Sequence, residues 1–265
     1  MTFKKSLLVV AVAAALLSAC SADKAAQKNS NQSTADNIAI DKTTTASEQA
    51  NALFDTLFNE GVQRNPVRQT YLGIKTDYDK WQDFSEENSA KELAIAKTNL
   101  KRVQSIDVKT LDAQTKISLS LFIQNLENHI ADYKWRFHSY PVNQMYGTHS
   151  QIPAFLINQH SISNIKEAQD YISRVQGAQK LLEQLVVQLK LREDKGIIAP
   201  KFVFPHVIRD SKNILKGAPF EDAPSSTILA DFTRKVDKLS ITDEEKSALD
   251  NTLDAVKKTV EETKL

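Results

Sequence analysis

The sequence predicts an all-α protein, an irregular multi-helix array, because apolar residues recur at helical spacing from residue 46 to the last residue. No segment shows the sustained alternation of apolar and polar residues that is typical of a half-buried strand. Glycine, which many tight turns require, occurs only six times in 265 residues. No internal repeat of fixed period is visible, so a solenoid or propeller is not expected.

Residues 1–19 have the pattern of a bacterial lipoprotein signal peptide. Two lysines precede an apolar run of 13 residues, which is too short to cross a bilayer core of roughly 30 Å. Leu17, two small residues and Cys20, the only cysteine, then resemble the lipobox of bacterial lipoproteins. In that group the cysteine is acylated, which implies that Cys20 is a lipid anchor and not a catalytic thiol. The alternative is an ordinary signal peptide that ends near a cysteine.

Residues 20–45 are expected to form a lipidated, flexible tether, because they are mostly small and polar and include no aromatic residue. Residue 21 is serine. In Gram-negative lipoproteins an aspartate at that position favours retention in the inner membrane. The resemblance therefore implies a cell-envelope protein anchored to the outer membrane and facing the periplasm, with the lipid bilayer as a partner through acylated Cys20.

The charge balance gives no reason to expect nucleic acid as a partner. The formal net charge is +1, and loss of residues 1–20 removes two lysines and no acid. With Cys20 lipidated, no thiol remains for a disulfide, so an apolar core must stabilise the fold.

A helical domain is predicted over residues 46–265, and its first three helices have recognisable starts. Ser47 is the expected N-cap of the first helix. Asn65 is the expected N-cap of the second, with Pro66 at its first position. The polar and aromatic residues 77–84 are expected to form a loop before a third helix that begins after Ser85.

A fourth apolar stripe runs from Leu119 to Phe137, and a long loop is predicted over residues 139–162 because it carries two prolines and a glycine. Ser163 or Asn164 is expected to cap a long helix that Gly196 ends. The remaining helices are expected over residues 205–216, after Ser226, and after the capping box formed by Thr242 and Glu245.

The sequence contains no recognisable catalytic or metal-binding motif. It lacks H-E-x-x-H and the glycine-rich phosphate loops, and no two of its five histidines are three or four residues apart. No catalytic residue, metal ligand or cofactor is therefore predicted in this chain. His149 and His160 share the 139–162 segment, and they could be either a metal pair or hydrogen-bonded histidines of a loop.

The 139–162 segment is the candidate binding cleft, because long structured loops are uncommon in helical domains. Aromatic and amide side chains gather there, a composition found in many binding clefts. The candidate cleft-lining residues are Tyr146, His149, Gln151 and His160. The alternative is that the aromatic residues of this region serve core and rim packing.

Three stretches together resemble the bacterial lipoproteins that contain the domain of unknown function 885. They are Asn-Pro-Val-Arg-Gln-Thr-Tyr-Leu-Gly at 65–73, the helix around Ala168 to Val175, and Gly-Ile-Ile-Ala-Pro at 196–200. The likeness covers roughly residues 50 to 240, nearly all of the domain that would follow the tether.

The resemblance implies a larger protein than this one. Family members are about twice as long, and their C-terminal half carries an H-E-x-x-H helix similar to that of zinc metallopeptidases. The chain is therefore expected to be the non-catalytic N-terminal half, truncated, with zinc only in the missing half. Its expected partner is a peptide substrate or a separate C-terminal catalytic half, as in a split enzyme. The alternative is a complete helical binding or scaffolding lipoprotein without enzymatic activity.

Overall fold

The computed structural model describes residues 44–263, with side chains up to residue 254. The chain divides into residues 1–42 and 43–265, and the expected signal peptide, Cys20 and nearly all of the tether lie outside the described residues. The described part is all-α, as predicted, with two isolated β-bridges and no strand. Its elements are α1 (Ala46–Gln63), α2 (Pro66–Tyr71), α3 (Glu86–Gln104), η1 (Val108–Thr110), α4 (Ala113–Asp132), η2 (Tyr133–Trp135), α5 (Thr148–Asn158), α6 (Ile165–Glu193), α7 (Val203–Ile214), α8 (Thr227–Val236) and α9 (Asp243–Thr263).

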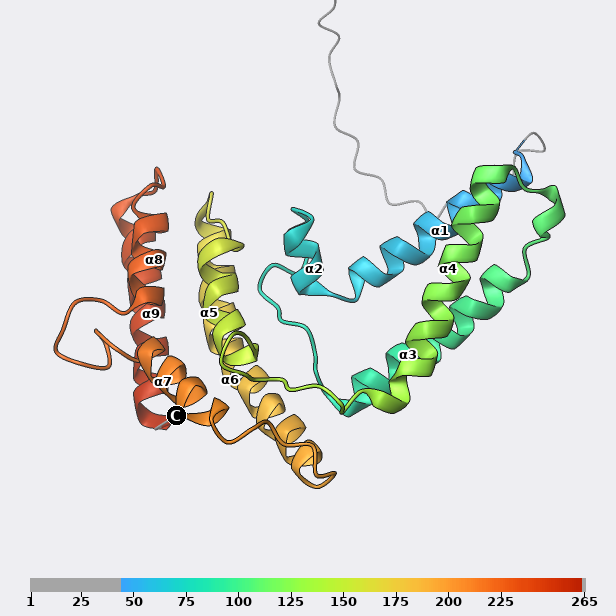
Figure 1. Ribbon diagram of the computed structural model, residues 1–265. Coiled ribbons are helices and arrows are strands. Elements are labelled where there is room, and N and C mark those ends of the chain that lie inside the picture. Colours follow the sequence, from blue (N-terminus) through green and yellow to red (C-terminus); the bar gives the residue numbers. More distant parts are fainter. Residues whose placement is uncertain (1–43, 264–265) are drawn as a thin grey trace, which may run out of the picture. The chain divides into compact units, whose positions relative to one another are not determined.

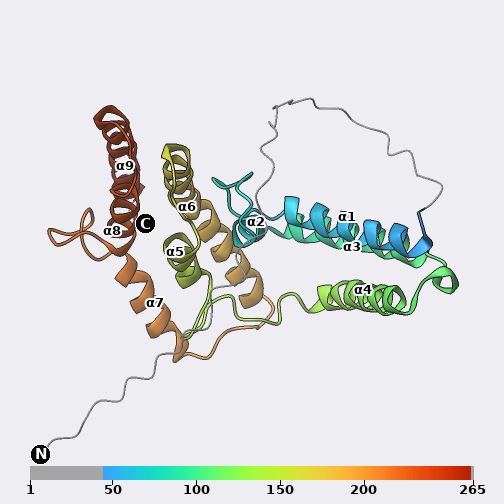
Figure 2. The same ribbon diagram turned by 90° about the horizontal axis from the view of Figure 1, so that it is seen from above.

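The first apolar core joins α1, α3 and α4, which lie side by side in Figures 1 and 2. Phe54 of α1 stacks on Phe122 of α4 with 5.1 Å between the ring centroids. The buried residues of this core are Ala50, Leu57, Val103, Leu111 and Leu119. Full burial of each large side chain stabilises the fold by about 1.5–3 kcal/mol.

The second core joins α5, α6, α8 and α9. Its buried residues are Ile152, Leu156, Ala168, Tyr171, Ile172, Leu181, Phe232, Val236 and Leu249. Trp81 packs against the same core from the loop that follows α2, and its indole nitrogen donates to the carbonyl of Arg174 at 2.7 Å. The loop predicted over residues 77–84 is present and contributes to this packing.

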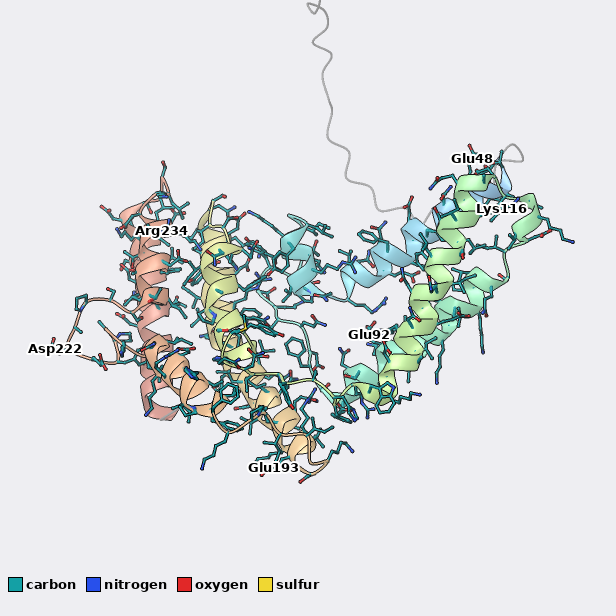
Figure 3. The ribbon with its side chains drawn as sticks, in the orientation of Figure 1. Glu48, Glu92, Lys116, Glu193, Asp222 and Arg234 are labelled. Carbon is teal, nitrogen blue, oxygen red and sulfur yellow. The ribbon has the colours of Figure 1, made fainter. Side chains whose placement is uncertain are left out.

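The helix starts confirm most of the predicted caps, but not those at Ser47 and Ser226. Asn65, Ser85 and Asn164 each accept a bond from a backbone N–H of their helix, as N-caps do. The cap of α1 is Thr45 and not Ser47. Thr45 forms a capping box with Glu48, which is labelled in Figure 3, whereas the Ser47 hydroxyl accepts from the backbone of Asp112 at 2.9 Å.

Three other predicted starts can be compared with the structure. Thr242 accepts from the Glu245 N–H at 3.2 Å, and the Glu245 carboxylate accepts from the Thr242 N–H at 2.9 Å, so this capping box is confirmed. Ser226 precedes α8 as expected, but its side chain makes no capping hydrogen bond. α7 begins at Val203 rather than at residue 205, because a proline is tolerated in the first turn, where N–H groups have no partner inside the helix.

The prediction of a continuous loop over residues 139–162 is wrong. Residues 148–158 form α5, with Pro153 inside it. Proline removes one hydrogen bond from a helix. The helix persists because Ile152, Phe155 and Leu156 are buried on one side of it, and that packing outweighs the lost bond.

α6 ends where the sequence predicts, at Gly196 with φ +71°. Ile197 N–H donates to the Arg192 carbonyl and Gly196 N–H to the Glu193 carbonyl, each at 2.8 Å, which is a Schellman motif. Among the described helices, none is both long enough and apolar enough to span a bilayer.

Candidate binding cleft and the buried arginine network

A cavity of about 580 Å³ lies between α3, α4, α6 and the segment that joins η2 to α5. Its volume is in the range of small-ligand pockets. The charged and amide groups that line it are Gln82 and Asp83 from the loop before α3, Glu86, Asn88 and Glu92 from α3, His129 and Asp132 from α4, Arg136, and Gln188 and Arg192 from α6. Phe84 and Tyr133 add aromatic surface, so the cavity offers both polar and apolar contacts.

Glu86 holds one side of the cavity together. Arg136 donates to one of its carboxylate oxygens at 2.9 Å and Gln188 to the other at 3.0 Å. Burial raises the pKa of Glu86, but the bonds from Gln188 and Arg136 outweigh burial and hold that pKa below its usual value. Glu86 is therefore ionised at neutral pH and links α3 to α6.

Arg192 holds another part of the cavity wall in place. Its guanidinium donates to the backbone carbonyls of Ser139, Arg136 and Gln188 at 2.9–3.0 Å, and the residue is buried. These bonds hold the chain after η2 against the C-terminal part of α6. Arg192 thus shapes the cavity mainly through the backbone that it binds.

Of the charged and histidine side chains that line the described cavity, two remain free for a ligand. His129 and Asp132 lie one turn apart on α4, and within the described residues neither side chain has a hydrogen bond or an ion pair. Glu92, by contrast, is paired with Arg64 at 2.9 Å. A bound molecule can therefore engage the His129 imidazole and the Asp132 carboxylate without breaking an existing contact.

The four predicted cleft-lining residues do not gather at this cavity. Tyr146 is 60% exposed and Gln151 is also exposed, whereas His149 and His160 are buried. The same segment contributes Ser139, Pro141 and Thr148 to the lining instead. A role of Tyr146 and Gln151 in binding stays a prediction.

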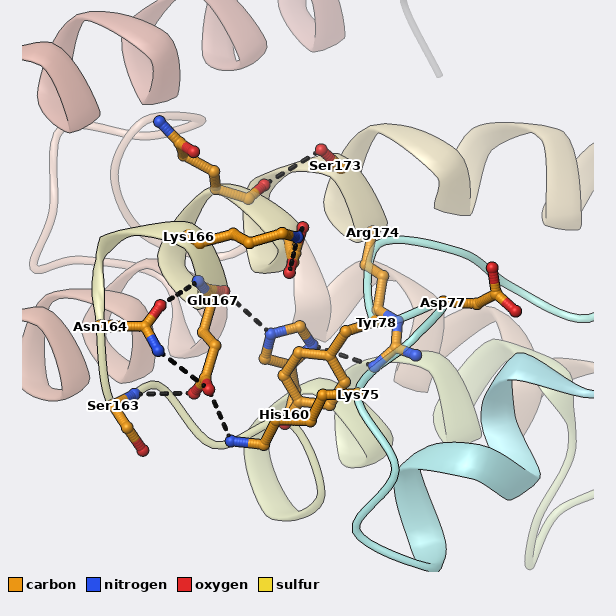
Figure 4. A network of polar contacts seen from close by, with 12 residues as sticks. Lys75, Asp77, Tyr78, His160, Ser163, Asn164, Lys166, Glu167, Ser173 and Arg174 are labelled. Carbon is orange, nitrogen blue, oxygen red and sulfur yellow. Dashed lines mark hydrogen bonds and ion pairs between the residues drawn. The ribbon is translucent and has the colours of Figure 1, made fainter. Parts of the chain in front are cut away.

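His160 belongs to a buried polar network, shown in Figure 4. Arg174 donates to its Nδ1 at 3.0 Å, so Nε2 carries the ring proton and donates to the Glu167 carbonyl at 3.1 Å. Burial lowers the pKa of His160 to about 3, and the nearby charges of Arg174 and Lys235 act in the same direction. The imidazole is therefore neutral at physiological pH, as a hydrogen-bonded structural histidine.

Arg174 is fully buried at the centre of this network. Besides His160, it donates to Thr70 Oγ1 at 2.8 Å and to the Lys80 carbonyl at 3.1 Å. Its guanidinium also lies 4.9 Å from the ring centroid of Tyr78. Burial lowers the pKa of Arg174 to about 10, so the group remains charged at neutral pH. Arg174 thus joins the segment around α2 to α6.

Glu167 completes the network at the start of α6. Its carboxylate accepts from Lys75 at 2.8 Å, from the Ser163 N–H at 2.9 Å and from Asn164 at 3.1 Å. Sequence reasoning missed Glu167 and Arg174, since charged residues on a long helix usually face solvent. The available signal was that Arg174 lies within one turn of Tyr171, Ile172 and Val175, inside the apolar stripe.

His149 lies in different surroundings from His160. Its Nδ1 is buried without a hydrogen-bond partner, and Gly147, with φ +152°, packs so closely that an added Cβ would meet Nδ1 at 3.0 Å. Burial lowers the pKa of His149, and the charge of Asp210 on α7 raises it in part. Across the described residues, no group of three or more His, Cys, Asp or Glu side chains is placed to hold a metal ion.

Comparisons with known proteins agree with the sequence resemblance. Residues 66–263 match the family described as "Bacterial protein of unknown function (DUF885)". A solved structure, "the putative lipoprotein from Colwellia psychrerythraea", superposes with a TM-score of 0.64 at 20% identity. The match covers 82% of this chain and 39% of that chain, so this chain spans well under half of that protein's length. At 20% sequence identity, this similarity shows that the two proteins share a fold and shows nothing more. No curated protein matches the chain.

Proposed function

Since the chain belongs to the DUF885 family of bacterial proteins of unknown function, we propose that it is the non-catalytic, N-terminal part of a longer, lipid-anchored envelope protein that binds peptides. The observation that carries this proposal is the cavity of about 580 Å³ with its unengaged His129 and Asp132. Support for a longer protein comes from the Colwellia structure, of which this chain spans 39%.

Peptide is the proposed ligand class because the cavity combines hydrogen-bonding, charged and aromatic groups. Asp132 can accept from a peptide N–H or pair with a basic side chain, and Tyr133 and Phe84 can pack against apolar side chains. In the longer protein, zinc and the hydrolytic residues would belong to the other part, and this part would hold the substrate.

Lipid anchoring is proposed through Cys20. Its support is the lipobox-like sequence from Leu17 to Cys20 and the lipoprotein description of the Colwellia structure. Serine at position 21 favours the outer membrane, with the helical domain in the periplasm. One acyl chain binds a bilayer only marginally, so the three chains implied by the lipoprotein pattern would give stable attachment.

The first test is the size of the native protein, measured by immunoblot of source-cell membranes with antibody against residues 50–260. We expect a band well above 29.7 kDa, the mass of this chain. A band at that mass would reject the longer protein. In the same membranes, an anchored protein should partition with detergent, and Cys20→Ser should release it.

The second test concerns zinc and peptide hydrolysis. The purified 265-residue chain should bind no stoichiometric zinc and hydrolyse no peptide, with or without added metal. Metal-dependent peptidase activity of this chain alone would contradict the non-catalytic assignment. The Asp132→Asn variant should bind a peptide mixture more weakly than the parent chain, while Asp222→Asn, at an exposed position outside the cavity, should not.

A second candidate function is a complete binding or scaffolding lipoprotein. A native band at 29.7 kDa together with peptide binding would support this alternative.

A further inference from the structure

The C-terminal part of α6, the connector after it and α7 present apolar side chains to solvent. Five of the exposed ones are Val186, Ile198, Phe202, Phe204 and Ile208, with exposed fractions of 49%, 53%, 60%, 39% and 53%. We call these five residues the α6–α7 face. Of the twelve residues of α7, only Val203 is buried. Three of the five residues, Val186, Ile198 and Phe204, meet at one site, and apolar side chains that gather on a protein surface often mark an interaction site.

The α6–α7 face includes a groove of about 230 Å³. Val186, Ile198 and Phe204 line it together with Leu189 and Ile197, and Tyr140, Pro141 and Val142 close it from the segment after η2. A groove lined by three separate segments of the chain can receive a protruding apolar side chain.

Charges flank the face on α7. Residues 201–216 contain four cations, Lys201, Arg209, Lys212 and Lys216, and one acid, Asp210, which is paired with Arg209 at 2.9 Å. Lys212 follows Ile208 at i+4, and so it lies beside the apolar stripe of the helix. A partner surface with apolar side chains at its centre and acidic residues at its rim would complement this face.

We propose that the α6–α7 face is the docking surface for the remainder of the longer polypeptide, through helices that insert an apolar side chain into the groove and present acidic residues to α7. The inference rests on the proposed function. More than half of the Colwellia chain lies outside the part that this chain matches, so its fold provides enough protein to cover such a face.

A membrane surface would also suit exposed phenylalanines beside lysines. The groove favours protein instead. A bilayer surface presents no single protruding side chain to fill a concave site, whereas a packed helix does.

The test is photocrosslinking in source cells that express the native gene at its natural length. Phe204 is replaced by p-benzoylphenylalanine, a larger aromatic residue tolerated at an exposed position, and Leu121 of α4, 54% exposed, receives the same replacement as the control. We expect adducts from position 204, mapped by mass spectrometry, to residues of the same polypeptide that follow residue 265. Position 121 should yield several-fold fewer.

Adducts from position 204 to lipid, to a second copy or to unrelated proteins would overturn the inference, as would equal yields at both positions. Failure of the proposed function and failure of the docking inference can be told apart by the immunoblot. It measures the length of the polypeptide and does not depend on what the α6–α7 face binds. A native band at 29.7 kDa would overturn both proposals, whereas a longer band without adducts beyond residue 265 would overturn only the docking inference.

Discussion

The guanidinium of Arg174 donates to Nδ1 of His160 at 3.0 Å, and both side chains are fully buried. The bond requires a neutral imidazole, because a protonated ring would have no lone pair to accept it. A protonated His160 would also place two positive charges in contact away from water. The cation thus fixes both the tautomer and the charge of the histidine.

Stability should therefore fall as the medium is acidified. The unfolded imidazole titrates near 6.5 and the folded one near 3, so between these values the unfolded chain binds one more proton. The free energy of unfolding should decrease as the pH falls below about 6.5, by up to about 1.4 kcal/mol per pH unit from His160. Urea unfolding at pH 7.5, 6 and 5 measures this slope.

Two variants identify the source of the slope. His160→Gln should be less stable at pH 7.5 but should lose less stability on acidification than the parent. Replacement of His138, an exposed histidine, by glutamine should leave the slope unchanged. Equal slopes in the His160 variant and the parent would show that another group is responsible.

Arg174→Met should destabilise the fold by about 3–5 kcal/mol, the cost of breaking a buried charged network. Thr70 Oγ1 and the Lys80 carbonyl would each lose a buried donor. Urea unfolding of both chains at pH 7.5 gives the difference in free energy. Arg209→Met removes an exposed arginine and should change stability by no more than about 0.5 kcal/mol.

Lys235→Met should cost about 3 kcal/mol, because it would remove the 2.7 Å ion pair of Lys235 with the buried carboxylate of Asp231 and leave the largely exposed Arg234 as the remaining cation of that carboxylate. It would also remove the donor to the carbonyls of Leu156, Ile157 and His160, each at 2.9 Å. The matched control is Lys246→Met, which breaks an exposed pair with Asp237 and should be nearly neutral. Thermal unfolding ranks the two variants, and equal midpoints would contradict the prediction.

Binding of a hydrophobic dye should report the α6–α7 face. The triple variant Phe202→Ser, Phe204→Ser and Ile208→Ser should reduce dye fluorescence of the isolated chain while changing stability by only about 0.5 kcal/mol per site, since all three side chains are exposed. The double variant Ile117→Ser and Leu121→Ser on α4 is the control. An equal loss in both variants would mean that the dye does not distinguish the face.

The all-α fold class and most of the helix ends could be predicted from the sequence, because both depend on residues that are close together in the chain. Asn65 followed by Pro66, and Thr242 with Glu245, set their helix starts through side chains within three residues. α5 could not be predicted in the same way. Gly147 and Pro153 favour a loop when only neighbouring residues are considered. The helix is favoured only by packing against residues that are distant in the sequence.

The candidate site could not be predicted either, because it too depends on contacts between residues that are far apart in the sequence. The cavity is built by α3, α4 and α6, so its lining could not be read from the 139–162 segment alone. The residues around Ser47 favour it as a helix cap, but its hydroxyl accepts a hydrogen bond from Asp112, which lies 65 residues later. Arg174 and His160 are only 14 residues apart, yet their burial depends on Thr70 and Lys80, about one hundred residues earlier.

The lysine on α8 also sets an order of events during synthesis. The carbonyls of Leu156 and Ile157 in the last turn of α5, and that of His160 just after it, receive their donor from Lys235, which follows the end of α5 by more than seventy residues in the chain. Until Lys235 has emerged, the end of α5 lacks this donor, and the buried Asp231 lacks its ion pair with Lys235. The contacts among α1, α3 and α4 all lie within residues 46–132. We therefore expect these three helices to fold before α5 is stabilised by the residues that follow it in the chain.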